Sequence, residues 1–420
     1  MNAAAGEEIL PTIRILNPEE KPVPLAATIP AKSADSPKNP YAERPPWVVD
    51  RGDGVLRCYI GTGFTASFDV RSGASILRNA DALVSTSARI ASISALDEMN
   101  LPSPKALRKR PEYWRSHYYG IMTVHRTTFP KTGEPILAAV LHGENKDVVI
   151  AKKWAQRKGH EFWQWPNTLL PESTTPLQMD EHYFGFIGLA WAPANESNGG
   201  FMAHDQGPIL WPQAGYIDAD GAQASHGVRH AYGLINGGFL YVFYLDTTDN
   251  EIRAARAPLD HLFERGAFRL LANGAYSQPA LPEGFDPANK SFLKRKPGRA
   301  DPILPGAPRS MRFQAARLRG TPYFLGIEHR LIKVDGKGSY EAWLHLSRDL
   351  IHWSDGTAIP GSRAAQYAGA IGQRPVLVNR DYSCLEEVDP DGFYIAGRSG
   401  RLKAGGIQLR FTRIALESKP

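Results

Sequence analysis

Three short segments of the chain carry a carboxylate among other polar side chains, directly after an apolar run. They are 142–145 (His-Gly-Glu-Asn), 246–248 (Asp-Thr-Thr) and 328–330 (Glu-His-Arg). Cleavage of a glycosidic bond needs one carboxylic acid that protonates the leaving oxygen and a second carboxylate that acts as nucleophile or activates water. We predict Glu144 as the general acid because a longer Glu side chain reaches the substrate oxygen, with Asp246 and Glu328 as base and pKa modulator.

In the second set of candidates, an arginine precedes each of five other apolar runs. Most of these arginines lie close to an aromatic residue, a histidine or a second charged residue. The set comprises Arg44 before Trp47, Arg115 before His117 and Tyr118, Arg229 beside His226 and His230, Arg312 before Phe313, and Arg380 beside Asp381. Arginine forms bidentate hydrogen bonds with carboxylates, and aromatic faces suit the apolar face of a pyranose. This set predicts a substrate-binding surface for acidic or densely hydroxylated sugars. Alternatively, the arginines only neutralise buried carboxylates and join neighbouring elements.

Five strand-like runs, each entered from a tight turn, must position these candidates. The runs are residues 54–61, 135–142, 238–245, 322–327 and 392–397, which are rich in aromatic and β-branched residues. Each has a preceding strand and a following one, the latter at 83–87, 187–191, 252–256, 344–348 and 407–411. Repeated antiparallel sheets are stable when they pack radially around a channel. We therefore predict an all-β, five-bladed β-propeller, with a two-sheet sandwich as the rival fold.

The propeller prediction brings both candidate sets to one place. The first strand of each blade lines the channel and the second runs antiparallel to it. The start of the first strand and the end of the second therefore share one mouth. Since the arginines begin the first strands and the carboxylates end the second strands, we expect them to meet in one funnel.

The repeat predicts a catalytic propeller over residues 41–417. Residues 1–40 are predicted as an extended arm, because prolines punctuate a polar, alanine-rich segment without periodicity. Residues 280–309 are predicted as a solvated basic loop over the propeller face. Residues 94–100 are the best helical candidate.

Composition narrows the class of partner. The net charge of +6 comes from dispersed Lys and Arg, which favours an acidic sugar over a nucleic acid. No run approaches the roughly 20 apolar residues of a membrane span, and the sequence as given starts with no export signal. The two cysteines, Cys58 and Cys384, predict buried small side chains. The histidines lack zinc-site spacing, so we expect no metal and no cofactor; compartment and oligomeric state stay open.

One segment carries a family resemblance. Residues 344–356 (Leu-His-Leu-Ser-Arg-Asp-Leu-Ile-His-Trp-Ser-Asp-Gly) resemble the third-strand signature of the five-bladed glycoside hydrolases, which include arabinanases, xylosidases and fructosidases; residues 188–191 and 254–257 are similar to their other blades. The resemblance implies a glycoside hydrolase acting on a poly- or oligosaccharide. That superfamily places its catalytic Asp early, in an Asp-Pro motif, whereas residues 44–50 here read Arg-Pro-Pro-Trp-Val-Val-Asp. Its catalytic triad is therefore not transferred to this chain.

Two other functions fit the same residues. In a polysaccharide lyase, Arg229 would neutralise a uronate carboxylate while His117, Tyr118 or His226 abstracts the C5 proton. A non-catalytic propeller would bind glycans without turnover.

Overall fold

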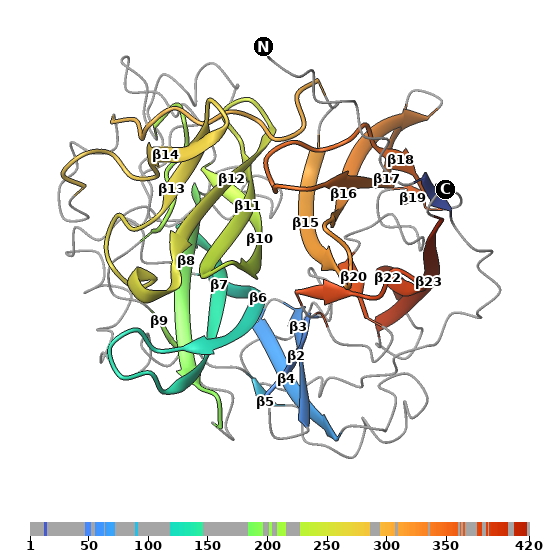
Figure 1. Cartoon of the computed structure of the whole chain (residues 1–420), viewed down its shortest axis with the longest axis horizontal. Coiled ribbons are helices and arrows are strands. Elements are labelled where there is room, and N and C mark those ends of the chain that lie inside the picture. Colours follow the sequence, from blue (N-terminus) through green and yellow to red (C-terminus); the bar gives the residue numbers. More distant parts are fainter. Residues whose placement is uncertain are drawn as a thin grey trace, which may run out of the picture.

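Strands dominate the part of the chain that the structure describes (Figure 1). The computed structural model describes residues 12–14, 47–51, 55–62, 64–71, 89–90, 118–145, 184–195, 201–203, 208–215, 227–285, 295–306, 310–334, 337–359, 362, 364–365, 376–379, 384, 386–401 and 407–417. Within these ranges the one helical segment is a single 3-10 turn, η2 (Leu259–His261). No helix in these ranges is long and apolar enough to cross a membrane.

The described strands form five sheets. The first sheet holds β2 (Trp47–Asp50), β3 (Val55–Thr62), β4 (Phe64–Arg71) and β5 (Arg89–Ile90). The second holds β6 (Tyr118–Thr128), β7 (Pro135–Asn145), β8 (Phe184–Pro193) and β9 (Met202–Ala203). The third holds β10 (Val228–Asn236), β11 (Phe239–Asp246), β12 (Glu251–Pro258), β13 (Arg269–Ala272) and β14 (Ala275–Pro279). The fourth holds β15 (Ser310–Leu318), β16 (Phe324–Val334), β17 (Lys337–Ser347), β18 (Thr357–Ala358), β19 (Ala364–Ala365) and β21 (Glu387–Val388). The fifth holds β1 (Thr12–Arg14), β20 (Val376–Val378), β22 (Phe393–Arg401) and β23 (Ile407–Glu417).

The first strands of the sheets surround a common centre. Strand β2 packs on β6, β6 on β10, β10 on β15, and β15 on β20. Figure 1 shows these strands near the middle of the molecule, with later strands of each sheet toward the rim. The ring closes where the backbone N–H of Cys384 donates a hydrogen bond to the carbonyl of Val48 at 2.8 Å. The prediction of an all-β propeller is confirmed, and Cys384 is buried as predicted.

The core lies between neighbouring sheets, and β11 shows why its sequence is apolar throughout. Val242 and Tyr244 pack toward the second sheet, whereas Tyr241 and Phe243 pack toward the fourth. Successive side chains of a strand point to opposite faces. A strand covered on both faces is therefore apolar at every position, rather than at alternate ones.

Phe313 joins the third and fourth sheets. Its ring is fully buried, 5.4 Å from the ring of Phe243 and 4.7 Å from that of Trp353. We expect Phe313→Ala to lower the free energy of unfolding by about 3–5 kcal/mol, because a ring-sized cavity replaces these contacts. Urea denaturation of this variant beside Phe129→Ala, whose ring is only partly buried, measures the effect. Equal losses in the two variants would contradict this account of the interface.

Residues 344–356, which carry the family resemblance, close the third strand of the fourth sheet with a turn. The carboxylate of Asp349 accepts hydrogen bonds from the backbone N–H groups of Ile351 and His352 at 2.9 and 2.8 Å. The turn directs Trp353 onto Phe313. The motif therefore has a packing role.

The second strands and four of the five following strands are confirmed, and the first repeat differs. Strand β4 (Phe64–Arg71) pairs with β3 from Thr62↔Phe64 onward. The prediction of 83–87 as that third strand is therefore wrong, because the chain reverses at once after β3; residues 83–87 and the helical candidate 94–100 lie outside the described residues.

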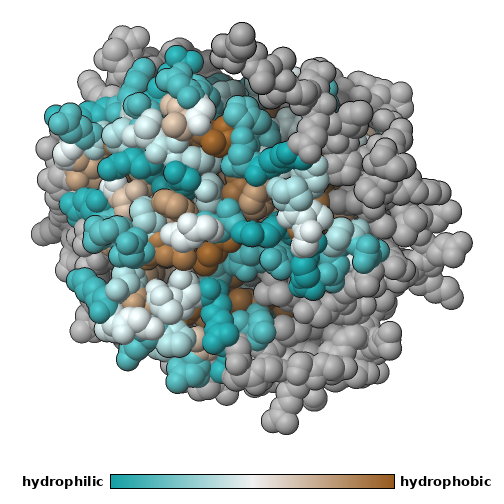
Figure 2. Space-filling view, viewed as in Figure 1, coloured by the Kyte–Doolittle hydropathy of each residue, from teal (hydrophilic) through white to brown (hydrophobic). Residues whose placement is uncertain are grey.

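Figure 2 shows that hydrophilic side chains cover most of one described face, with small apolar patches between them.

Two predicted irregular segments contain ordered packing. In the predicted solvated loop 280–309, Ala300, Ile303 and Leu304 are buried. The backbone N–H of Ile303 donates to the carbonyl of Ile252 at 2.9 Å, so this part of the loop prediction is wrong: its apolar residues cover the edge of β12. Within the predicted arm 1–40, residues 12–14 form β1, which pairs with β23.

Candidate functional site

In three sheets the strand register pairs the start of the first strand with a predicted polar segment of the second strand. Val228 at the start of β10 pairs with Asp246 at the end of β11, and Tyr118 at the start of β6 pairs with Glu144 near the end of β7. Ser310 at the start of β15 likewise pairs with Arg330 of β16. We call this end of the sheets the funnel mouth.

His230 has the most unusual backbone at the funnel mouth. Its φ is 53°, in the left-handed region, and β10 changes register between Arg229 and Tyr232. A non-glycine residue in this region costs on the order of 1–3 kcal/mol and persists where the surroundings impose it, often at functional sites. Here Nδ1 of His230 lies 2.9 Å from the carbonyl oxygen of Met311 in the next sheet. Since a carbonyl can only accept, Nδ1 carries the proton.

The surroundings keep His230 neutral. Burial, followed by the charges of Arg312, His142 and Arg229, lowers the pKa of His230 well below its ordinary value. A neutral imidazole with its proton on Nδ1 has a lone pair on Nε2. This partly exposed side chain can therefore accept a hydrogen bond or a proton.

Two arginines flank His230: Arg229 precedes it in β10, and Arg312 comes from the fourth sheet. Arg312 is buried in β15 and donates to the hydroxyl of Tyr232 at 3.4 Å. Among the described residues no carboxylate lies within ion-pair distance of Arg312. Arg229 is partly exposed, and its Cγ would lie 3.0 Å from a methyl group placed on Gly185. The mouth thus holds two cations around one neutral base.

The second sheet reaches the same place through His142 and Gly185. The ring of His142 lies 6.4 Å from that of His230, and its Cε1 would lie 3.2 Å from a methyl group on Gly185. Glu144 pairs with Gly185, two residues beyond His142 in β7. Alternate positions of a strand share a face. The position of Glu144 therefore belongs to the face of β7 that carries His142.

Asp246 lies at the mouth end of β11 with 0% of its surface exposed. Its carboxylate accepts hydrogen bonds from the backbone N–H groups of Gln213 and Thr248 at 2.8 and 2.9 Å. Burial raises the pKa of Asp246, opposed by the charge of Arg253 at 4.0 Å. These partners hold the carboxylate between β12 and residues 208–215, away from solvent.

Glu328 is also 0% exposed. It accepts hydrogen bonds from Ser310, from Arg330 at 2.6 Å and from His345 at 3.0 Å, all in the fourth sheet. Burial alone would raise the pKa of Glu328, but the hydrogen bonds from His345, Arg330 and Ser310 hold it below its ordinary value. Asp246 and Glu328 are thus enclosed separately, each within its own part of the fold, and their arginine partners, Arg253 and Arg330, lie outside the predicted set of five.

Trp47 does not offer an open platform for a sugar. It is 3% exposed, and its Nε1 donates to the carbonyl of Val124 at 2.8 Å. Its ring packs 5.7 Å from that of His125 and 6.4 Å from that of Tyr232. The prediction of Trp47 as a substrate-binding residue is therefore wrong in this structure, because packing of the channel wall covers its faces.

Several candidates lie outside the described residues. These are Arg44, Arg115, His117, His226, Arg380 and Asp381. Of Tyr118, the structure describes the strand position alone.

Sequence reasoning missed a polar link across the channel. Nδ1 of His125 in β6 lies 2.9 Å from a carboxylate oxygen of Glu386, which precedes β21, and its Nε2 lies 2.9 Å from the hydroxyl of Thr123. Glu386 is about one-third exposed. The available signal was the placement of Thr123 and His125 on one face of a strand. The carboxylate that His125 contacts, Glu386, is far away in the sequence, so this signal alone does not indicate the link.

No protein-family model and no curated protein matches the chain. Solved structures similar to it include the catalytic domain of a GH62 alpha-L-arabinofuranosidase from Coprinopsis cinerea, 11% identical over 94% of this chain and 95% of that one, with a TM-score of 0.43. An endo-arabinase from Bacteroides thetaiotaomicron VPI-5482 is 10% identical over 94% and 97%, with a TM-score of 0.44. An exo-1,5-alpha-L-arabinanase from a bovine ruminal metagenomic library is 10% identical over 90% and 97%, with a TM-score of 0.42. The propeller fold of this chain is assigned from its own five sheets.

Proposed function

We propose that this protein is a glycoside hydrolase that binds an acidic poly- or oligosaccharide at the funnel mouth. The observation that carries the proposal is the convergence of Arg229, Arg312 and neutral His230 from adjacent strands, beside the position of Glu144. Arginines recognise the planar carboxylate of a uronic acid. The lone pair on Nε2 of His230 supplies a proton acceptor, which hydrolysis requires and binding alone does not.

In this proposal Glu144 is the general acid that protonates the leaving oxygen. His230 accepts a proton or hydrogen bond at Nε2 from the attacking water. The cations Arg229 and Arg312 disfavour protonation of His230 in the free protein. A substrate carboxylate beside them offsets this repulsion and raises the pKa of His230 on binding. The base is therefore activated by the acidic substrate itself.

A panel of neutral and uronate-containing glycans, assayed for new reducing ends, tests the proposal. We expect turnover with uronate-containing members. The absence of new reducing ends with every member would overturn it.

A polysaccharide lyase is the second candidate, because a neutral histidine beside two arginines also suits abstraction of the C5 proton of a uronate. A lyase yields an unsaturated uronate that absorbs ultraviolet light, whereas a hydrolase does not. Products with this absorbance would transfer the assignment from hydrolase to lyase.

Arg229 provides a test of substrate charge. We expect Arg229→Gln to raise KM for an acidic glycan by about 10-fold or more, since a charge-assisted hydrogen bond contributes about 1.5–3 kcal/mol. Steady-state kinetics with the acidic glycan and its neutral, carboxyl-reduced form measure the effect, with Arg126→Gln at an exposed position of β6 as control. An equal loss on both glycans would contradict recognition of a carboxylate.

A further inference from the structure

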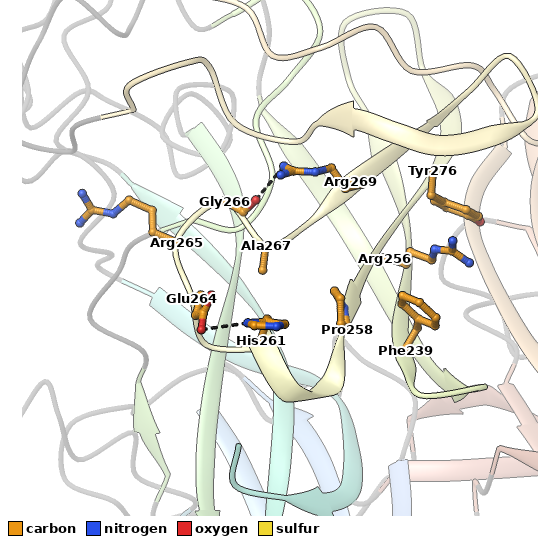
Figure 3. A pocket seen from close by; sticks show the side chains of 10 residues that line it. All are labelled: Phe239, Arg256, Pro258, His261, Glu264, Arg265, Gly266, Ala267, Arg269 and Tyr276. Atoms are coloured by element: carbon orange, nitrogen blue, oxygen red, sulfur yellow. Dashed lines mark hydrogen bonds and ion pairs between the residues drawn. The ribbon is translucent and has the colours of Figure 1, made fainter. Parts of the chain in front are cut away.

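A pocket of about 370 Å³ lies at the end of the third sheet opposite the funnel mouth (Figure 3). Phe239, in its wall, begins β11 and pairs with Asn236 and Pro258, whereas Asp246 ends the same strand at the mouth. The length of this eight-residue strand, on the order of 25 Å, separates the pocket from the mouth. The pocket is therefore a separate feature of the blade.

Arg256 is held in place within this pocket by aromatic rings. Its guanidinium carbon lies 4.2 Å from the ring centroid of Phe239 and 4.7 Å from that of Tyr276. Figure 3 shows the side chain between these two rings. Its Nη1 donates to the hydroxyl of Tyr241 at 3.0 Å. Because the rings already order this partly exposed side chain, little conformational entropy is lost when it binds an anion.

Two further arginines, Arg265 and Arg269, line the same pocket. Arg265 and Arg269 are exposed, and Nη1 of Arg269 donates to the carbonyl of Gly266 at 2.8 Å. Neither these two nor Arg256 forms an ion pair with a carboxylate of the described residues. The three arginines line the pocket at separate points, with Arg256 and Arg265 extended in opposite directions in Figure 3, and none of them has a carboxylate counter-charge among the described residues.

The one carboxylate in the pocket lining is already engaged. An oxygen of Glu264 lies 3.0 Å from Nδ1 of His261. The hydrogen bond between His261 and Glu264, together with the charges of Glu264 and Asp260, raises the pKa of His261. Glu264 is thus directed toward the histidine rather than the arginines, as the dashed line in Figure 3 indicates.

We propose that this pocket is a second binding site for an acidic sugar unit, a uronate or a sulfated residue, of the glycan bound at the mouth. The anionic groups of neighbouring sugar units would meet Arg256, Arg269 and Arg265 separately, while the apolar edges of Phe239 and Tyr276 meet the C–H face of one sugar ring. This inference rests on the proposed function for its ligand class. A polysaccharide held at two sites on one molecule is retained more tightly than at either alone.

Titration calorimetry with a galacturonate trisaccharide, a sulfated galactose trisaccharide and the neutral galactose trisaccharide tests the site. The full chain carries Glu144→Gln and Arg229→Gln, so that turnover and binding at the mouth are suppressed. We expect one or both anionic sugars to bind at least 10-fold more tightly than the neutral one, and to slow hydrogen exchange in residues 258–269. Adding Arg265→Gln and Arg269→Gln removes both effects, whereas Lys at these two positions retains most of the affinity.

Ionic strength and a control variant distinguish specific binding at this pocket from other binding. Binding weakens as ionic strength rises, because exposed charges are screened. Adding Arg126→Gln instead leaves binding unchanged. Equal binding of the neutral sugar, or full binding after loss of both arginine charges, would overturn the site. If no glycan is turned over but galacturonate still protects residues 258–269, the proposed function fails and the pocket assignment stands.

Discussion

Replacing Glu144 by Gln is expected to lower kcat by about 10²–10⁴-fold, the range that general acid catalysis typically contributes. Glutamine has the shape of glutamate but cannot supply a proton to the leaving oxygen. Because the change is nearly isosteric, we expect the melting temperature and the affinity for substrate to stay close to those of the unchanged protein. Kinetics on the best glycan of the panel, calorimetry and thermal unfolding measure the three quantities.

Glu134→Gln is the matched control for this experiment. Glu134 is exposed in the turn between β6 and β7, at the opposite end of the hairpin that carries Glu144. We expect it to leave kcat unchanged. Full activity of Glu144→Gln would remove Glu144 from the mechanism, and loss of affinity without loss of kcat would instead indicate a sugar-binding role.

Glu328→Ala is expected to lower the free energy of unfolding by about 3–5 kcal/mol, because removing one member of a buried ion pair leaves the other charge uncompensated. Here Arg330, whose side chain is 11% exposed, would lose its partner 2.6 Å away. Urea denaturation measures the loss. The surface pair of Glu387 and Arg319, with side chains 41% and 49% exposed, provides the control. Glu387→Ala should cost no more than about 1 kcal/mol.

The acid sensitivity of the protein should change with Glu328 as well. The pKa of Glu328 in the folded state lies below its ordinary value, so the folded state binds fewer protons than the unfolded chain. The stabilisation is therefore complete above the ordinary pKa of glutamate and is lost as pH falls through the lower, folded value. Glu328→Ala should unfold with less dependence on pH in this acid range. A variant that keeps the full dependence, or one with normal stability and no activity, would contradict the structural role.

Strand order and register follow from local properties of the sequence. The runs at 135–142 and 238–245 are apolar at nearly every position between turn signals, which predicts strands buried on both faces. Their antiparallel pairing with the preceding strands then places Glu144 and Asp246 at one end of the sheets, as the register confirms. Residues 64–71 alternate apolar and polar residues, which is typical of a strand, but alignment with the other repeats favoured 83–87 as the third strand of the first repeat.

The environment of each candidate side chain depends on contacts that local sequence does not encode. Asp246 and Glu328 occupy similar positions in their repeats, yet Gln213, outside the third sheet, helps to enclose Asp246, whereas His345, on the next strand of the same sheet, helps to enclose Glu328. His230 becomes a neutral base only where Met311 and Arg312 of another sheet meet it. Hydrophobic periodicity along a strand is a local signal, so the amino-acid sequence determines the repeated sheets and the common mouth. Burial and charge are sums over neighbours from other strands and other sheets, so only the tertiary structure decides which polar groups at the mouth are enclosed and which remain available for chemistry.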